Sequence, residues 1–182
     1  MEAKDDLMKQ KGLTLLELLL VLTIVAVLLT AGVPTFSKHI HHTKVKILAL
    51  DLMQAAQKTR TIAVSKNQRA TLRNFGRWEN GWEIFIDSNS NGIRDETEES
   101  LGEHRHDTAS ASIKVYTGKT AVRHYISYTG QGISRAANGA LMMDTIVICP
   151  TSQGGGYALA LWHSGRMRLH PISPQECNKA SP

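Results

Sequence analysis

The sequence predicts an α+β protein in which one long helix precedes a head of antiparallel strands. Two observations lead to this fold class. An apolar run from Leu13 to Val33 passes into a stretch with helical periodicity that reaches about Ser65. Short segments rich in β-branched and aromatic residues, separated by turn-forming clusters, then fill residues 67–182.

The apolar run over residues 13–33 contains a single charged residue, Glu17. About 20 apolar residues at a helical rise of about 1.5 Å match the hydrocarbon core of a bilayer, about 30 Å thick. We therefore expect a transmembrane helix segment here. Gly32 and Pro34 predict a bend where the helix leaves the membrane, because proline removes a backbone donor and clashes with the preceding turn.

Residues 34–66 are predicted to continue the helix in amphipathic form, because apolar positions recur every three or four residues. The apolar stripe consists of Val45, Leu48, Leu52, Ala55, Thr59 and Ile62. It needs a sheet to cover it, and the head supplies seven candidate strands. These are Arg69–Phe75, Trp82–Asp87, Ile113–Thr117, Arg123–Thr129, Leu141–Cys149, Tyr157–Trp162 and Arg166–His170.

The acidic residue at the start of the apolar run needs a reason, because a carboxylate within a bilayer costs about 2.5–3.5 kcal/mol. A cut between Gly12 and Leu13 supplies one, since the new α-ammonium of Leu13 can pair with Glu17 of a neighbouring copy or partner. A secretory signal has a short apolar core with its cleavage site after it, whereas here the glycine precedes a long run. An uncleaved anchor is the other alternative.

The segment Gly12-Leu13-Thr14-Leu15-Leu16-Glu17 with its apolar helix resembles the N-terminus of type IV prepilins and pseudopilins. The resemblance implies that a prepilin peptidase removes the leader, residues 1–12, and methylates Leu13, where the family usually has phenylalanine. It implies a type IV pilin-like fold, a long N-terminal helix packed on an antiparallel β-sheet head, and assembly with other pilins or pseudopilins through Glu17. The expected location is the bacterial inner membrane, single pass with the head in the periplasm, and then the pilus fibre.

Charge is unevenly placed along the chain. Lys and Arg outnumber Asp and Glu eight to one over residues 35–75 and seven to two over 113–182, whereas acidic residues outnumber basic ones nine to three over 76–112. A basic head interrupted by one acidic segment favours a polyanionic partner, and a solvated basic surface without a partner is the alternative.

Two further segments resemble the GspH/FimT branch of the family, Trp78–Gly92 and Gly165-Arg166-Met167-Arg168. The second is similar to the glycine-arginine-x-arginine segment of FimT-type minor pilins, which bind DNA during natural transformation. On a strand, Arg166 and Arg168 point to one face and can contact successive phosphates of double-stranded DNA. Solvated arginines on an edge strand are the alternative. The basic residues that can widen the site are Lys114, Lys119, Arg123 and Arg135.

Cys149 and Cys177 are the two cysteines of the chain. An even pair in a head outside the cytoplasm predicts a disulfide, which closes a loop and is worth about 3 kcal/mol in the chain-entropy model.

The acidic segment has the spacing of a twelve-residue calcium loop, with Asp87, Asn89, Asn91, Asp95 and Glu98 as ligands. Arg94 is a poor neighbour for a cation, and the segment joins strands rather than helices. The alternative is a loop rich in Asx residues and glycine whose side chains bond their own backbone. We expect no metal, with the calcium loop left open.

No catalytic set emerges, so we expect neither an enzyme nor a cofactor. His104 and His106 flank Arg105 in a polar stretch that we interpret as a solvated loop. The sequence favours a minor type IV pilin that captures extracellular double-stranded DNA. A GspH-like minor pseudopilin of a type II secretion system is the main alternative, and a membrane-anchored hydrolase is disfavoured.

Overall fold

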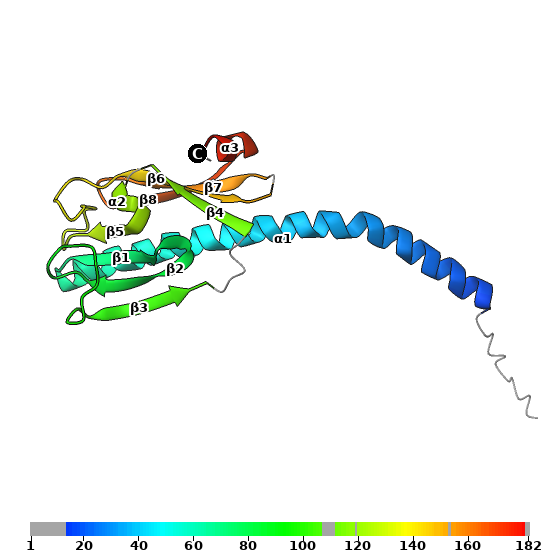
Figure 1. Ribbon diagram of the computed structural model, residues 1–182, viewed down its shortest axis with the longest axis horizontal. Coiled ribbons are helices and arrows are strands. Elements are labelled where there is room, and N and C mark those ends of the chain that lie inside the picture. Colours follow the sequence, from blue (N-terminus) through cyan, green and yellow to red (C-terminus); the bar gives the residue numbers. More distant parts are fainter. Residues whose placement is uncertain (1–13, 107–111, 119, 153, 181–182) are drawn as a thin grey trace, which may run out of the picture. The chain divides into compact units, whose positions relative to one another are not determined.

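The computed structural model describes residues 14–106, 112–118, 120–152 and 154–180, without the side chains of 30–41 and 120. Contacts divide the chain into two units, residues 1–39 and 40–182. The elements, labelled in Figure 1, are α1 (Leu15–Lys66), β1 (Ala70–Phe75), β2 (Arg77–Ile86), β3 (Ser100–Arg105), β4 (Ile113–Thr117), α2 (Thr120–His124), β5 (Tyr125–Tyr128), β6 (Asp144–Pro150), β7 (Gly156–Leu161), β8 (Met167–Ile172) and α3 (Pro174–Ala180).

The first unit contains the start of α1. Thr14 caps the helix, because its Oγ1 accepts the Glu17 N–H at 3.2 Å, and Thr14-x-x-Glu17 has the residues of a capping box. The large apolar side chains between Leu15 and Leu29 are exposed. Within the described residues, the structure has no helix with the length and hydropathy that crossing a bilayer requires. The helix continues through Gly32 and Pro34, and the bend there stays a prediction.

The end of α1 is fixed by a Schellman motif. Asn67 has a φ of 49°, and its N–H donates to Val64 O at 3.3 Å while the Gln68 N–H donates to Ala63 O at 3.1 Å. Asparagine tolerates the left-handed conformation that this motif needs after the last helical residue. The helix thus ends within one residue of the predicted Ser65.

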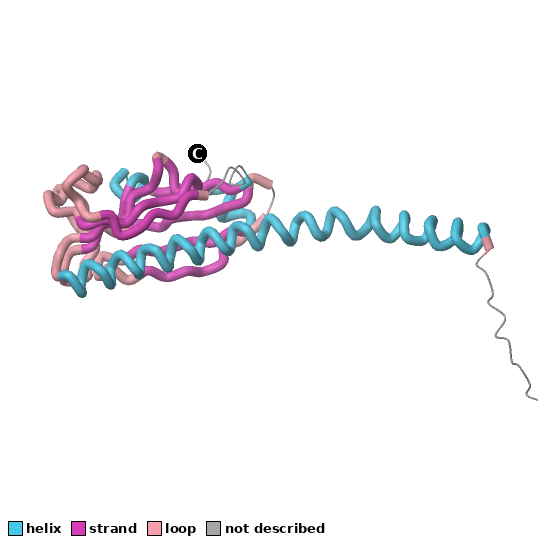
Figure 2. The backbone as a smooth tube through the Cα atoms, turned by 90° about the horizontal axis from the view of Figure 1, so that it is seen from below, coloured by secondary structure: helices cyan, strands magenta, loops and turns pink. Residues whose placement is uncertain are grey.

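The strands of the second unit form two antiparallel sheets of four strands each. Sheet A has the order β3-β2-β1-β5, and sheet B has the order β4-β6-β7-β8. Figures 1 and 2 show both sheets lying along the C-terminal part of α1. The antiparallel head behind a long helix confirms the predicted fold class.

The core lies where the C-terminal part of α1 meets both sheets. Val45, Leu48, Leu52, Ala55 and Thr59 of the predicted stripe are buried, and Ile62 is half-buried. Ala49, Ala56 and Ala63 are buried beside them. Small residues let a sheet approach the helix closely, so one helix can serve two sheets.

Four of the predicted elements were wrong in part. The predicted strand Trp82–Asp87 begins at Arg77 and ends at Ile86. Residues 123 and 124 belong to α2 and not to the strand, which begins at Tyr125. Leu141 makes only an isolated bridge with Arg135, and β6 begins at Asp144. The stretch expected to be a polar loop forms β3, which pairs with β2.

Candidate functional site

The turn of the β7–β8 hairpin is built around a glycine. Gly165 donates its N–H to Trp162 O at 2.8 Å, and Trp162 donates its N–H to Arg166 O at 2.9 Å. This is the pattern of a three-residue loop with a G1 bulge. Gly165 has a φ of +77°, and an added Cβ would lie 2.0 Å from Gly132 O. Both the turn and the close approach therefore require glycine.

A half-buried arginine ties this hairpin to the end of α1. The Nε of Arg60 donates to Gly132 O at 2.8 Å, and its Nη2 donates to Ser164 O at 3.2 Å. One helical side chain thus joins the β5–β6 loop to the β7–β8 turn. This contact sets the position of the residues that follow Gly165.

Arg166 and Arg168 lie on the outer face of sheet B, the face turned away from α1. Met167 between them is buried, whereas both arginines and His170 are exposed. Arg168 pairs with Ala160 on the edge strand β8, and the two arginines are about 7 Å apart along the chain direction. Within the described residues, neither guanidinium makes a hydrogen bond or an ion pair.

Lys114 shares this outer face but lies at its opposite edge. It is exposed on β4 and pairs with Cys149. Three strand spacings and four residues of rise separate it from Arg168, about 20 Å in all. The arrangement puts cations at both edges of the outer face.

Two of the remaining predicted basic residues, Arg123 and Arg135, belong to elements other than β8. Arg123 is exposed on α2 and lines a hollow of about 370 Å³ with Tyr116 of β4. Arg135 donates its Nη1 to Gly139 O at 2.7 Å within the β5–β6 loop. Lys119 lies outside the described residues.

The disulfide between Cys149 and Cys177 is present and confirms the prediction. It fastens α3 to β6, with a Cα–Cα distance of 5.8 Å. The cap of α3 is formed by Glu176, whose carboxylate accepts the Ser173 N–H at 2.8 Å and the Ser173 hydroxyl at 2.9 Å. These two hydrogen bonds lower the pKa of Glu176, and His170 contributes a smaller electrostatic effect.

The acidic loop is held by hydrogen bonds from its own backbone. The buried Asp87 carboxylate accepts the N–H groups of Asn91 and Gly92, each at 3.0 Å, and the Thr71 hydroxyl at 2.8 Å. Glu98 accepts the Ser88 and Asp95 N–H groups at 2.8 and 3.1 Å. Backbone donors therefore bond to both carboxylates, as expected for the hydrogen-bonded loop, and the calcium loop stays a prediction.

A cluster of aromatic rings on sheet A was not predicted from the sequence. His104 lies in β3 and not in a loop, and its ring centroid is 5.3 Å from that of the buried Trp82. His106 is half-buried, 5.2 Å from Trp82 and 4.5 Å from His104. Burial and the neighbouring His104 lower the pKa of His106. The alternation His104-x-His106 was the available signal, since it places both rings on one face of a strand.

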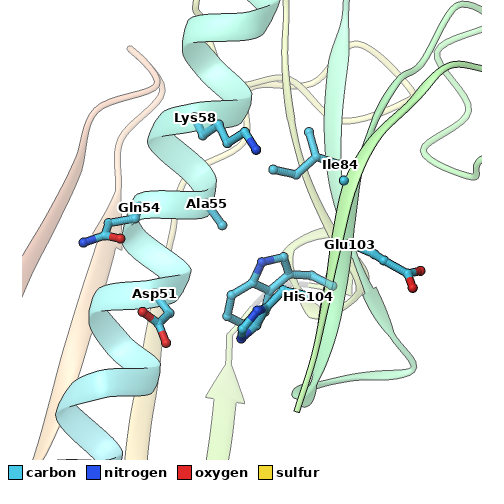
Figure 3. Close-up of a pocket in the computed structure, with 9 residues that line it drawn as sticks. Asp51, Gln54, Ala55, Lys58, Ile84, Glu103 and His104 are labelled. Carbon is cyan, nitrogen blue, oxygen red and sulfur yellow. The ribbon is translucent and has the colours of Figure 1, made fainter.

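A hollow of the head lies between α1 and this cluster. It has a volume of about 430 Å³, and Figure 3 shows Asp51 on the helix opposite His104 and Lys58 pointing toward Ile84. The two helix charges have opposite signs and are two turns apart. The groove therefore does not present one sign of charge to a polyanion, in contrast to the outer face of sheet B.

The predicted processing residues Gly12 and Leu13 lie outside the described residues. The nearest described site residue is Glu17, which is exposed in the first turn of α1. A carboxylate at this place favours the helix, because it faces the positive end of the helix dipole. Glu17 thus has a local role in starting α1, besides the assembly role expected from the sequence.

Comparison with known proteins identifies the family. The model of the prokaryotic N-terminal methylation motif matches residues 7–33, and that of type II transport protein GspH matches residues 48–165. The pilin-like protein PilA1 of Thermus thermophilus is 30% identical over 168 residues, which cover 89% of this chain and 99% of that protein.

The fold agrees with two crystal forms of the type IV minor pilin FimU of Pseudomonas aeruginosa. The first has a TM-score of 0.56 at 21% identity, covering 73% of this chain and 94% of FimU. The second has a TM-score of 0.54 at 20% identity, covering 71% and 97%. From the methylation motif, the matched domain and the PilA1 relative, the chain belongs to the GspH family of type IV prepilin and pseudopilin proteins.

Proposed function

We propose that this protein is a minor type IV pilin whose head binds double-stranded DNA without sequence preference and supports DNA uptake in natural transformation. The carrying observation is the pair Arg166 and Arg168, both exposed on one face of an edge strand and free of ion pairs within the described residues. Planar guanidiniums at this spacing suit phosphate oxygens of a nucleic acid backbone. Lys114 extends the positive charge to the far edge of the same face.

The proposal includes the N-terminal region. Prepilin peptidase would cleave after Gly12 and methylate Leu13, both inside the matched methylation motif. The exposed apolar side chains from Leu15 to Leu29 would hold the chain in the inner membrane and later pack among other pilins in the fibre. Glu17 would pair with a Leu13 ammonium of a neighbouring subunit.

The test measures binding of the full chain, purified in a nonionic detergent, to a fluorescent duplex of arbitrary sequence over a series of salt concentrations. Because the contacts go to phosphates, log K should fall linearly with log salt, with a slope of about −0.9 for each phosphate neutralised. Arg166→Gln and Arg168→Gln should each flatten the slope by about one unit.

The matched control is Arg105→Gln, which removes the same charge from an exposed arginine on sheet A. It should leave the slope close to that of the parent. A parent protein without salt-dependent binding, or a double variant of Arg166 and Arg168 that binds as well as the parent, would refute the DNA proposal.

The second candidate function is a minor pseudopilin of a type II secretion system, and the match to the GspH model favours it. In that role the head would contact other pseudopilins and not DNA. A deletion strain separates the two functions when transformation frequency and protein secretion are measured in parallel. Loss of transformation with normal secretion supports the minor pilin, and the reverse supports the pseudopilin.

A further inference from the structure

One of the three tryptophans is exposed beside the arginine pair. Trp162 has 54% of its surface exposed, whereas Trp78 and Trp82 have 2% and 3%. Burial of a large aromatic ring normally stabilises the fold, and an exposed ring does not contribute this stabilisation. Its place on the surface therefore needs a reason other than folding.

Trp162 lies on the outer face of sheet B. It is the last residue before the β7–β8 turn, and its N–H bonds to Arg166 O across the hairpin. Leu161 before it is buried and pairs with the buried Met167. Because side chains alternate along a strand, Trp162 and Arg166 point to the same outer face. Arg168 lies one step further along β8 on that face.

The residues that precede Trp162 on the outer face of β7 have small side chains. Ala158 and Ala160 precede it on the outer face of β7. On the side away from β8 the β6–β7 pairing ends at Asp144 and Leu161, and the Ser134 hydroxyl donates to Trp162 O at 2.9 Å. Two cations thus lie on the β8 side of an open aromatic ring, and two alanines precede it on its own strand.

We infer that Trp162 is a stacking platform for an unpaired base, so that the head prefers single-stranded DNA, or a frayed duplex end, to the interior of a duplex. The inference rests on the proposed DNA-binding function: it keeps the phosphate contacts of the arginines with duplex DNA and adds a preference for unpaired bases. Aromatic side chains beside a positively charged track are the elements by which proteins hold single strands, since every base offers a π face. Arg166 and Arg168 would bind the phosphates that flank the stacked base.

An intact duplex cannot use this platform, because its base faces are already stacked on each other and become available only when a nucleotide leaves the helix. The arginines contact both forms through phosphates, so they contribute to both affinities. Trp162 should contribute to the single strand alone. Replacing it with alanine should weaken single-strand binding about five-fold or more.

The experiment uses the full chain in nonionic detergent and two probes, a single-stranded oligonucleotide without self-complementarity and a duplex closed by hairpins at both ends. Tryptophan fluorescence reports the contact directly, because only Trp162 of the three tryptophans is open to solvent. The single strand should quench this emission and bind more tightly than the closed duplex. Trp162→Ala should lose that preference, and binding of the closed duplex should stay within about two-fold.

Two further variants separate stacking from apolar contact. Trp162→Phe keeps an aromatic ring and should retain most of the preference, whereas Trp162→Leu keeps apolar area without a π face and should lose it. Ile93→Ala is the matched control, because Ile93 is 51% exposed on the acidic loop, and it should bind both probes as the parent does.

The outcomes distinguish this inference from the function on which it rests. If neither probe binds, the DNA-binding function fails. If the closed duplex binds with a salt-dependent affinity and Trp162→Ala or Trp162→Leu leaves single-strand binding unchanged, the stacking platform is refuted while the DNA-binding function stands. In that second case, the exposed Trp162 ring is an apolar contact for another protein.

Discussion

Gly165→Ala should lower the free energy of unfolding of the head for two reasons, the positive φ of this residue and the close approach of Gly132 O. A residue other than glycine at a φ of +77° carries a backbone penalty of about 1–2 kcal/mol. The added Cβ would lie 2.0 Å from Gly132 O, so that oxygen must move. The same oxygen accepts the Arg60 Nε hydrogen bond, and a hydrogen bond to a charged group contributes about 1.5–3 kcal/mol. The total loss is about 3 kcal/mol or more.

Gly139→Ala is the control that isolates the backbone penalty. Gly139 has a φ of +81°, and nothing lies within 4 Å of the position of its added Cβ. It should lose about 1–2 kcal/mol. Urea unfolding followed by circular dichroism measures both variants, with the free energy taken by linear extrapolation.

A double-variant cycle tests the role of Arg60 in this loss. In an Arg60→Met background the hydrogen bonds to Gly132 O and Ser164 O are already absent. Gly165→Ala should then cost only slightly more than the control, which gives a coupling free energy of about 1–2 kcal/mol. Equal losses for Gly165→Ala and Gly139→Ala in the parent would refute the close-approach argument.

Four further outcomes are expected from other parts of the chain. Gly12→Leu should leave full-length protein in the membrane, and mature-sized protein on an immunoblot would contradict cleavage after Gly12. Glu17→Gln keeps the length of the capping side chain but removes its charge, so it should be processed and yet be missing from purified pili; normal incorporation would exclude the ion pair. Replacing Cys149 and Cys177 with serine should lower the free energy of unfolding by about 3 kcal/mol, and an unchanged urea midpoint would contradict this. The folded pKa of His106 is lowered from 6.5, so the unfolded chain binds more protons below about pH 6.5 and stability should fall as pH falls through that window; His106→Gln should flatten the profile.

The elements that the sequence predicts well have strong local patterns, either a run of β-branched and aromatic residues or a helical period of apolar residues. The strand Ile113–Thr117 is found with its predicted bounds, because its β-branched and aromatic residues favour a strand over a helix or a loop. The predicted strand Tyr157–Trp162 differs by one residue at each end. The stripe of α1 is buried as expected, since its period fixes one face of a helix.

The strand β3 was not predicted, because the alternation of His104 and His106 is a weak signal and the stability of the strand comes from its partner. Ser100–Arg105 contains glycine, glutamate, histidine and arginine, which have low β-propensity, and its side chains are mostly exposed. Pairing with β2 supplies the hydrogen bonds. Gly81 of β2 makes the approach possible, since an added Cβ there would lie 2.1 Å from His104 O. Such a contact is set by the fold and not by local sequence.

The helix α3 was missed although its signal is present. Ser173, Pro174 and Glu176 have the pattern of a capping box with proline at the first helical position. The same pattern of Thr14 and Glu17 marks the start of α1. A search for capping boxes would have found the N-termini of both α1 and α3. The helix α2, with five residues, has too few turns to show a helical period.

The Gly165-Arg166-Met167-Arg168 segment separates into residues that the fold needs and residues that it does not. Gly165 is required by its turn and by Gly132, and Met167 is buried against the core. Arg166 and Arg168 extend from the opposite face and make no ion pair within the described part of the head. Exposed charges of this kind contribute little to stability. Folding therefore accounts for the glycine and the methionine but not for the arginines. The proposed anionic partner supplies a physical reason for two guanidiniums at alternate positions beside an open tryptophan, and protection of the edge strand is the alternative that the salt series tests.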